Sequence, residues 1–198
     1  VARIMGYKFP ANFRRPYFAA SFSEFWTRWH ISLSSWLRDY LYIGLGGNRR
    51  GKTRTYRNLM TTMLLGGLWH GANWTFIGWG ALHGCDLVGQ RVLGELASFS
   101  PVRIRWPRAI ARSAQVIVVF ALVCVGWVFF RAASFGEAMT VLYRIEFLGD
   151  WNAASLPLKF QAMKGLALVA LLVTIELVAE QPALRLAYYR SRTARTCG

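Results

Sequence analysis

One histidine lies where the sequence carries almost no charge. His70 stands in GGLWHGANW, residues 66–74, and residues 58–90 contain no lysine, no arginine and a single acid, Asp86. An ionisable side chain in so apolar a segment is costly and is usually functional. A histidine can take a proton from a hydroxyl group near neutral pH. The pattern therefore favours a functional His70 over a buried histidine whose ring nitrogens are satisfied by nearby backbone.

The neighbours of this histidine also suit a site. Three glycines beside it permit a close approach of backbone or ligand, and Trp69 and Trp74 are candidates for the walls of a narrow channel. The other two histidines are weaker candidates. His30 lies at the edge of an apolar helix face, where packing and function are both open, and His83 in ALHG is predicted to be structural.

A basic stretch, GGNRRGKT at residues 46–53, fits the formal phosphate-loop pattern GxxxxGK[ST]. A phosphate loop also needs a strand before it and a helix after it within an α/β sheet. Here an amphipathic segment precedes the match and membrane-like sequence follows. We therefore favour a basic loop whose arginines and Lys52 contact lipid headgroups or an anionic cytoplasmic partner. A nucleotide site would require ATP binding that is lost on Lys52→Ala.

No other recognisable chemistry accompanies these residues. The sequence has no GxSxG, no metal-ligand cluster and no paired carboxylates at a recognisable spacing. Its three cysteines, Cys85, Cys124 and Cys197, are far apart and lack CxxC spacing. They predict neither a disulfide framework nor a zinc site.

The elements that must position the histidines follow from the apolar pattern. Residues 21–43 carry an aromatic stripe opposite a polar, partly basic face, and Ser21 and Glu24 have capping-box spacing. Such a helix lies in the membrane interface. Residues 58–93 are too long for one crossing of about 20 residues and short for two. The glycines near His70 break this stretch, which predicts a re-entrant hairpin or two half-helices.

Two further segments, residues 114–130 and 163–179, have the length and composition of transmembrane helices. The chain is 55% hydrophobic and 15% aromatic with nine tryptophans, and its net charge of +15 lies in basic blocks between apolar runs. This alternation favours membrane loops over a nucleic-acid surface. The prediction is an all-α, polytopic integral membrane protein with a single membrane domain over residues 1–198. Its basic blocks face the cytoplasm.

Two long motifs then resemble a known family. SFSEFWTRWHISLSSWLRDYLYIGLGGNR and YRNLMTTMLLGGLWHGANWTFIGWGALHG are similar to the membrane-bound O-acyltransferase family, in its alginate O-acetylase branch. GWVFFRAASFGEAMTVL also resembles that branch, and the resemblance covers roughly residues 5–145. The transfer protein for D-alanine in teichoic acid synthesis is a more distant relative.

The resemblance implies a catalytic site and a route for substrates. It makes His70 the essential histidine and places His30 in the same tunnel, within a ring of helices. His70 would act as a base or become transiently acetylated, and the sequence leaves both routes open. Asn73 is a candidate oxyanion donor. A tunnel lined by tryptophans would exclude water and limit hydrolysis of the thioester.

The resemblance also implies substrates and partners. The acetyl donor would be acetyl-CoA or an acyl-carrier thioester from the cytoplasm, with no bound cofactor and no metal. The acceptor would be an exopolysaccharide such as alginate, reached directly or by relay through periplasmic acetyltransferase partners at the bacterial inner membrane. Members of the family are well over twice this length, so the chain is expected to be a C-terminal portion. The alternative is a non-catalytic membrane scaffold, an export subunit or an inactive truncated fragment.

Overall fold

The structure is a computed structural model that describes residues 5–6, 11–99 and 107–146. The chain divides into two compact units, Val1–Ile145 and Glu146–Gly198, and nearly all described residues belong to the first. The described residues form helices and no strand, which confirms the all-α class for this part of the chain. The elements in chain order are η1 (Pro16–Phe18), α1 (Phe22–Arg28), α2 (Ile31–Trp36), η2 (Leu37–Tyr42), α3 (Lys52–His70), α4 (Trp74–Phe99), α5 (Arg108–Arg131) and α6 (Phe135–Glu146).

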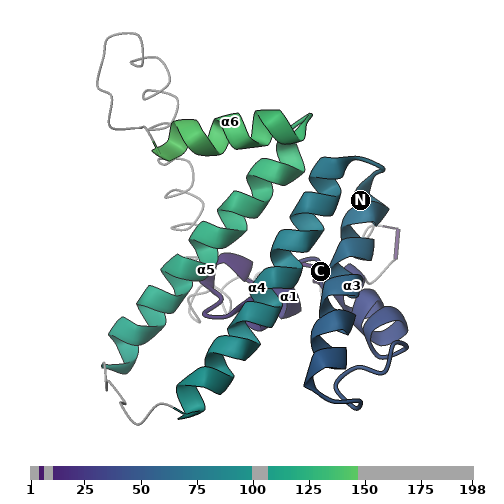
Figure 1. The fold of residues 1–198 in the computed structure, drawn as a ribbon, viewed down its shortest axis with the longest axis vertical. Helices are drawn as coiled ribbons and strands as arrows, with labels where there is room; N and C mark the ends of the chain where they lie inside the picture. The colour runs from purple at the N-terminus through teal and green to yellow at the C-terminus, as the bar shows by residue number, and fades with distance from the viewer. Residues whose placement is uncertain (1–4, 7–10, 100–106, 147–198) are drawn as a thin grey trace, which may run out of the picture. The chain divides into compact units, whose positions relative to one another are not determined.

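The apolar stretch around His70 folds as a hairpin of α3 and α4 (Figure 1). α3 ends at His70, and a short turn leads into α4. Glycines let the two backbones touch. A Cβ atom at Gly67 would lie 2.2 Å from the carbonyl oxygen of Phe76, and one at Gly80 would lie 2.4 Å from that of Met63. Small residues permit such close helix crossings, so the glycines set the hairpin's geometry.

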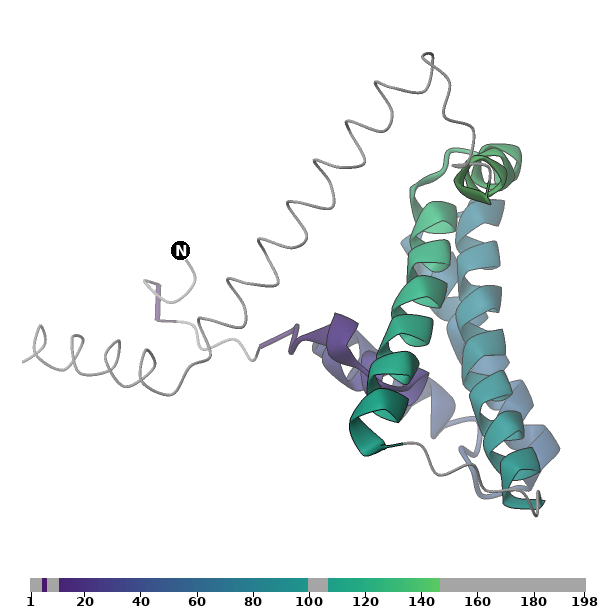
Figure 2. The same ribbon diagram turned by 90° about the vertical axis from the view of Figure 1, so that its left-hand side faces the viewer.

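α5 lies beside α4 in both ribbon views (Figures 1 and 2). It is the one helix among the described residues that is long and apolar enough to cross a membrane, and it contains the predicted span 114–130. Ile117 and Val118 are exposed on it, as a lipid-facing surface requires. α6 runs across the end of α5 (Figure 1). The second predicted span, 163–179, lies outside the described residues.

The segment 21–43, predicted as one amphipathic helix, is broken into α1, α2 and the π-helix η2. The predicted cap is present, because the Ser21 hydroxyl accepts a hydrogen bond from the backbone N–H of Glu24 at 3.1 Å. The break falls at two residues. Trp29 is extended, and His30 takes a left-handed conformation with φ 40°. No glycine or proline marks this point, so the apolar pattern carries no sign of the break.

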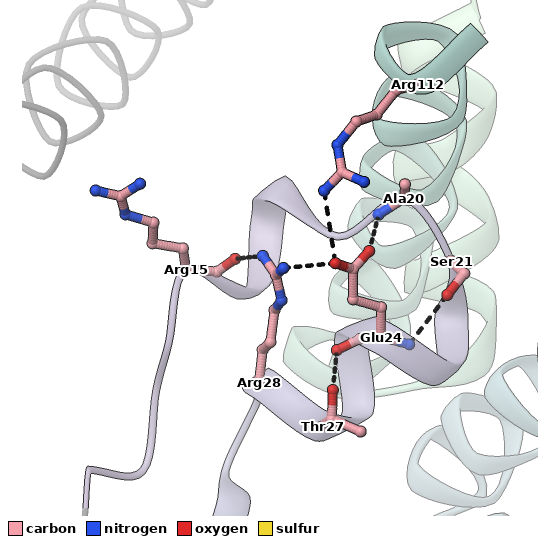
Figure 3. Close-up of polar contacts among 7 residues, drawn as sticks. All are labelled: Arg15, Ala20, Ser21, Glu24, Thr27, Arg28 and Arg112. Atoms are coloured by element: carbon pink, nitrogen blue, oxygen red, sulfur yellow. Dashed lines mark hydrogen bonds and ion pairs between the residues drawn. The ribbon is translucent and has the colours of Figure 1, made fainter. Parts of the chain in front are cut away.

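Glu24 anchors α1 to its surroundings (Figure 3). Its carboxylate accepts hydrogen bonds from the backbone N–H of Ala20 at 2.6 Å and from Arg28, one helical turn later, at 2.5 Å. Arg112 of α5 lies 3.6 Å from the same carboxylate. Arg28 also donates to the carbonyl oxygen of Arg15. One half-buried acid thus joins the lead-in, α1 and α5.

The core of this unit consists of two clusters of buried side chains. The first lies between the lead-in, α1, α3, α4 and α5, and the second lies between α4, α5 and α6. Together they hold α1 against the hairpin and fix the end of α5 beside the α3–α4 turn. The principal members are Phe22, Phe25, Met63, Leu87 and Val123 in the first cluster and Trp79, Phe129 and Ala138 in the second.

The opposite end of the hairpin is polar. Lys52 at the start of α3 forms an ion pair with Glu95 of α4 at 2.7 Å. Asn58 is buried at 2% exposure, and its amide donates to the carbonyl oxygens of Leu45 and Gly47, which fixes the basic loop before α3. The formal phosphate-loop match falls in this loop. Within the described part of the chain, a π-helix and turns precede it and no strand does.

Candidate active site

His70 lies inside a shell of aromatic rings. Its ring centroid is 5.4 Å from that of Trp79 in α4 and 5.0 Å from that of Phe130 in α5, at interplanar angles of 89° and 81°. Trp69 and Phe76 contact the same ring at 5.0 and 6.2 Å. Edge-to-face contacts of this kind fix the orientation of a ring. The imidazole is therefore held by α3, α4 and α5 together, and it remains half-buried.

The turn that presents His70 is fixed by Asn73. The amide oxygen of Asn73 accepts a hydrogen bond from the backbone N–H of Thr75 at 3.2 Å, an arrangement that caps α4. Its amide nitrogen donates to the carbonyl oxygen of Ala133 at 3.2 Å. The α3–α4 turn is thereby tied to the turn between α5 and α6. The amide oxygen and one amide hydrogen of Asn73 are engaged in these contacts.

His30, the second histidine predicted to belong to the site, lies forty residues before His70 in the chain. It stands between α1 and α2, with its ring centroid 6.0 Å from that of Phe13. Its Nδ1 atom is buried and has no hydrogen-bond partner among residues 11–99 and 107–146. Within the described part of the chain the rings that contact His70 are different ones, so a shared site for the two histidines stays a prediction.

His83 has a different environment. It is fully buried, stacked on Phe25 at 6.2 Å and met edge-on by Trp26 and Trp79 at 5.2 and 4.9 Å. The described residues give neither ring nitrogen a hydrogen bond, and the closest carboxylate oxygen, on Asp86, is 3.8 Å from Nδ1. These contacts are those of a packed core residue. Trp79 connects this core to the His70 shell, because its ring contacts both histidines.

The two tryptophans of the GGLWHGANW motif lie at the edge of the site. Trp69 contacts the His70 ring but is 64% exposed, and Trp74 is 76% exposed. Among the described residues, the wall of the site is instead formed by Trp79 and Phe130. Neither residue was among the predicted site residues. A signal was present for Trp79, which lies four residues before His83 and so shares its helix face.

The described residues supply His70 with aromatic neighbours and no acidic partner. No carboxylate in residues 11–99 or 107–146 forms an ion pair with it, and no three His, Cys, Asp or Glu side chains there gather to hold a metal ion. Lys52 of the phosphate-loop match lies at the far end of α3 and is paired with Glu95. What these residues offer chemically is an oriented imidazole in apolar surroundings.

Comparison with known proteins then decides the family. The family model described as the membrane-bound O-acyltransferase family matches residues 4–135, which include both His30 and His70. The chain belongs to this family. The match spans α1 to α5 and confirms the resemblance found in the two long motifs.

Several relatives are named for acyl transfer. A probable alginate O-acetylase of Azotobacter vinelandii is 51% identical over 154 residues, which are 77% of this chain and 29% of that protein. A peptidoglycan O-acetyltransferase of Helicobacter pylori is 43% identical over 135 residues, 68% of this chain and 24% of that protein. A teichoic acid D-alanyltransferase of Streptococcus thermophilus is 41% identical over 95 residues, 44% of this chain and 23% of that protein. The chain spans less than a third of the length of these curated relatives.

Proposed function

We propose that this membrane-bound O-acyltransferase chain carries the catalytic histidine of an O-acetyltransferase. It moves acetyl groups from a cytoplasmic thioester across a bacterial inner membrane for O-acetylation of an extracellular polysaccharide. The observation that carries this proposal is the His70 imidazole, held edge-on by the rings of Trp79 and Phe130 at the end of α3. Both His30 and His70 lie in the matched family region. His70 is the catalytic residue, and His30 lines the same site.

The reaction requires a base for the acceptor hydroxyl. As the hydroxyl oxygen attacks the thioester carbonyl carbon, its proton passes to His70, and the carbonyl oxygen becomes an oxyanion. The intermediate then collapses. The carbon–sulfur bond breaks, and the leaving thiolate takes the proton from the imidazolium. In a second route a ring nitrogen of His70 attacks the thioester carbonyl carbon, the carbon–sulfur bond breaks, and the thiolate takes the proton from the other ring nitrogen. The acceptor hydroxyl then attacks the acetyl carbon, the carbon–nitrogen bond breaks, and the hydroxyl proton returns to the ring. Both routes use the same ring in the same orientation.

The neighbours of His70 support either route. The rings of Trp79 and Phe130 keep bulk water away from one side of the imidazole, which limits hydrolysis of the donor. Trp69 and Trp74 line the outer part of the passage to this ring. Asn73 stands three residues from His70, and the amide hydrogen not bonded to Ala133 is the candidate donor to the oxyanion.

The acceptor is a carbohydrate hydroxyl. The relatives from Azotobacter vinelandii and Helicobacter pylori are named for O-acetylation of alginate and of peptidoglycan, and both of these contain polysaccharide chains. The identity of 51% over most of this chain favours an alginate-like exopolysaccharide. Acetyl-CoA or an acyl-carrier thioester supplies the acetyl group, and periplasmic acetyltransferase partners receive it where the transfer is by relay.

The test is His70→Ala in the complete open reading frame that contains this chain. The variant should insert into membranes at the wild-type level while O-acetyl groups on the polysaccharide fall by about 100-fold or more, since a general base contributes on that order.

The matched control is Lys52→Ala, which removes an exposed ion pair far from His70 and should leave acetylation unchanged. Retained acetylation in the His70 variant would favour a scaffold or export role. ATP binding by the wild type that is lost in Lys52→Ala together with acetylation would favour a nucleotide site.

A further inference from the structure

The backbone at His30 is strained, and the strain needs an explanation. His30 has φ 40° and ψ 56°, and among the described residues only Arg15 shares a positive φ without being glycine. For an L-residue this left-handed conformation costs about 1–2 kcal/mol. Histidine is one of the few residue types enriched there, together with asparagine and aspartate. Strain of this kind persists only where surrounding contacts impose it.

The contacts that surround His30 come from a distant part of the chain. The carbonyl oxygen of Asn12 accepts the backbone N–H of Ile31 at 2.9 Å, and its side-chain oxygen accepts the backbone N–H of Ser32 at 3.0 Å. These two N–H groups begin α2, and the first N–H groups of any helix lack partners within the helix. His30 occupies the N-cap position, yet its own side chain makes no capping bond. Asn12 supplies the cap in its place.

A third bond braces the other side of the break. The backbone N–H of Arg14 donates to the carbonyl oxygen of Arg28 at 2.9 Å, just before the chain turns. The ring of Phe13 packs against those of Trp29 and His30, and the Ser34 hydroxyl makes a local hydrogen bond to the carbonyl oxygen of Trp29 at 2.8 Å. The hydrogen bonds of Asn12 and Arg14 tie the backbone on both sides of the bend to the lead-in.

We propose that Asn12 is a positioning residue, which caps α2 through both of its oxygens and thereby holds His30 in its left-handed conformation at the junction of α1 and α2. In an unbroken helix over residues 21–43, His30 would lie at the edge of the apolar face. Because the chain bends at His30 itself, the direction of its side chain depends on the bend. The proposal rests on the proposed function, in which His30 lines the site of His70.

The activity test compares Asn12→Ala with Asn12→Asp in membrane vesicles that contain the full-length protein and labelled acetyl-CoA. Alanine keeps the backbone acceptor and removes the side-chain acceptor, whereas aspartate keeps both. Loss of a cap of this kind should lower the maximal transfer rate by about fivefold, with an unchanged KM for acetyl-CoA, and aspartate should restore it. In a His30→Asn background the Asn12→Ala change should have no further effect. An equal fall in both backgrounds, or no fall in either, would overturn the proposal.

A geometric test does not depend on turnover. Cysteines are placed at positions 30 and 70 in a protein whose natural cysteines are serine, and a short bifunctional thiol reagent is applied to the membranes. The cross-linking yield should fall at least severalfold on Asn12→Ala and recover on Asn12→Asp. A yield indifferent to residue 12 would refute the positioning role, whether or not acetyl transfer is detected. The proposed function fails separately, through retained acetylation in His70→Ala.

Discussion

Two breaks in helices present the two histidines of the site, and they differ in origin. The break after His70 is local, because Gly71 and Asn73 lie at the turn itself and cap the helices that meet there. The break at His30 has no such residues. Its turn is held by hydrogen bonds from Asn12 and Arg14, about 15 to 20 residues earlier in the chain. One break is therefore encoded where it occurs, and the other is imposed by tertiary contacts.

The two breaks also differ in their backbone: the α3–α4 hairpin is rigid, whereas the backbone at His30 is strained. The hairpin of α3 and α4 is closed by direct backbone contact at Gly67 and Gly80, where no side chain fits. At His30, by contrast, a residue of the proposed site has a left-handed backbone conformation that glycine would adopt with less strain. Substitutions at the rigid α3–α4 hairpin and at the strained backbone of His30 should therefore have different consequences for stability.

The largest expected effect is therefore at the hairpin. Gly67→Ala puts a Cβ atom 2.2 Å from the carbonyl oxygen of Phe76, and a backbone atom cannot move aside as a flexible side chain can. We expect a loss of about 3 kcal/mol or more in the free energy of unfolding, at or above the usual range for overpacking. Thermal unfolding of the detergent-solubilised protein measures it.

The matched control for this substitution is Gly94→Ala on α4, where a new Cβ meets open space. Alanine is favoured over glycine in a helix by about 1 kcal/mol, so this variant should be slightly more stable than the wild type. If Gly67→Ala were as stable as this control, α3 and α4 would not pack by direct backbone contact.

The same contrast explains what the sequence alone could predict. The hairpin break, the Ser21 cap and the apolar helix over 114–130 follow from local residue types, and the structure contains all three. The broken helix between residues 21 and 43 does not, because its cause lies at Asn12. Trp79 and Phe130 were not predicted as neighbours of His70, because the rings that surround it depend on which helices pack together. The apolar pattern predicts which face of each helix is buried, but it does not predict which other helix packs against that face.

Glycine substitutions at the two histidines should change the free energy of unfolding by less than Gly67→Ala does, and in opposite directions. His30→Gly removes a strained left-handed residue, so it should raise the free energy of unfolding by about 0.5 kcal/mol after the added freedom of the unfolded chain is counted. His70→Gly lies in a helix and should lower it by about 1 kcal/mol. Both changes should reduce acetyl transfer. Differential scanning fluorimetry in detergent measures the stability arm, and equal signs at the two positions would contradict the assigned difference in backbone strain.

The smallest effect is expected at the polar end of the hairpin, where Lys52 meets Glu95 outside the apolar stretch 58–93. Hydrogen bonds from Lys52 and Tyr56 hold the pKa of the Glu95 carboxyl below its usual value, and the same pairing raises the pKa of Lys52. A lowered carboxyl pKa contributes stability that is present above the unfolded-state pKa and is lost as pH falls through the folded-state pKa. The stability difference between wild type and Glu95→Gln should therefore be largest near pH 7 and shrink as the pH falls from about 4, the unfolded-state pKa, to the lower folded-state pKa. Because both side chains are exposed, added salt should reduce the stability difference as well.

Thermal midpoints of the two proteins at pH 3 to 7, with and without salt, measure both trends. A difference independent of pH would mean that the end of the hairpin far from His70 is held by packing and owes nothing to charge.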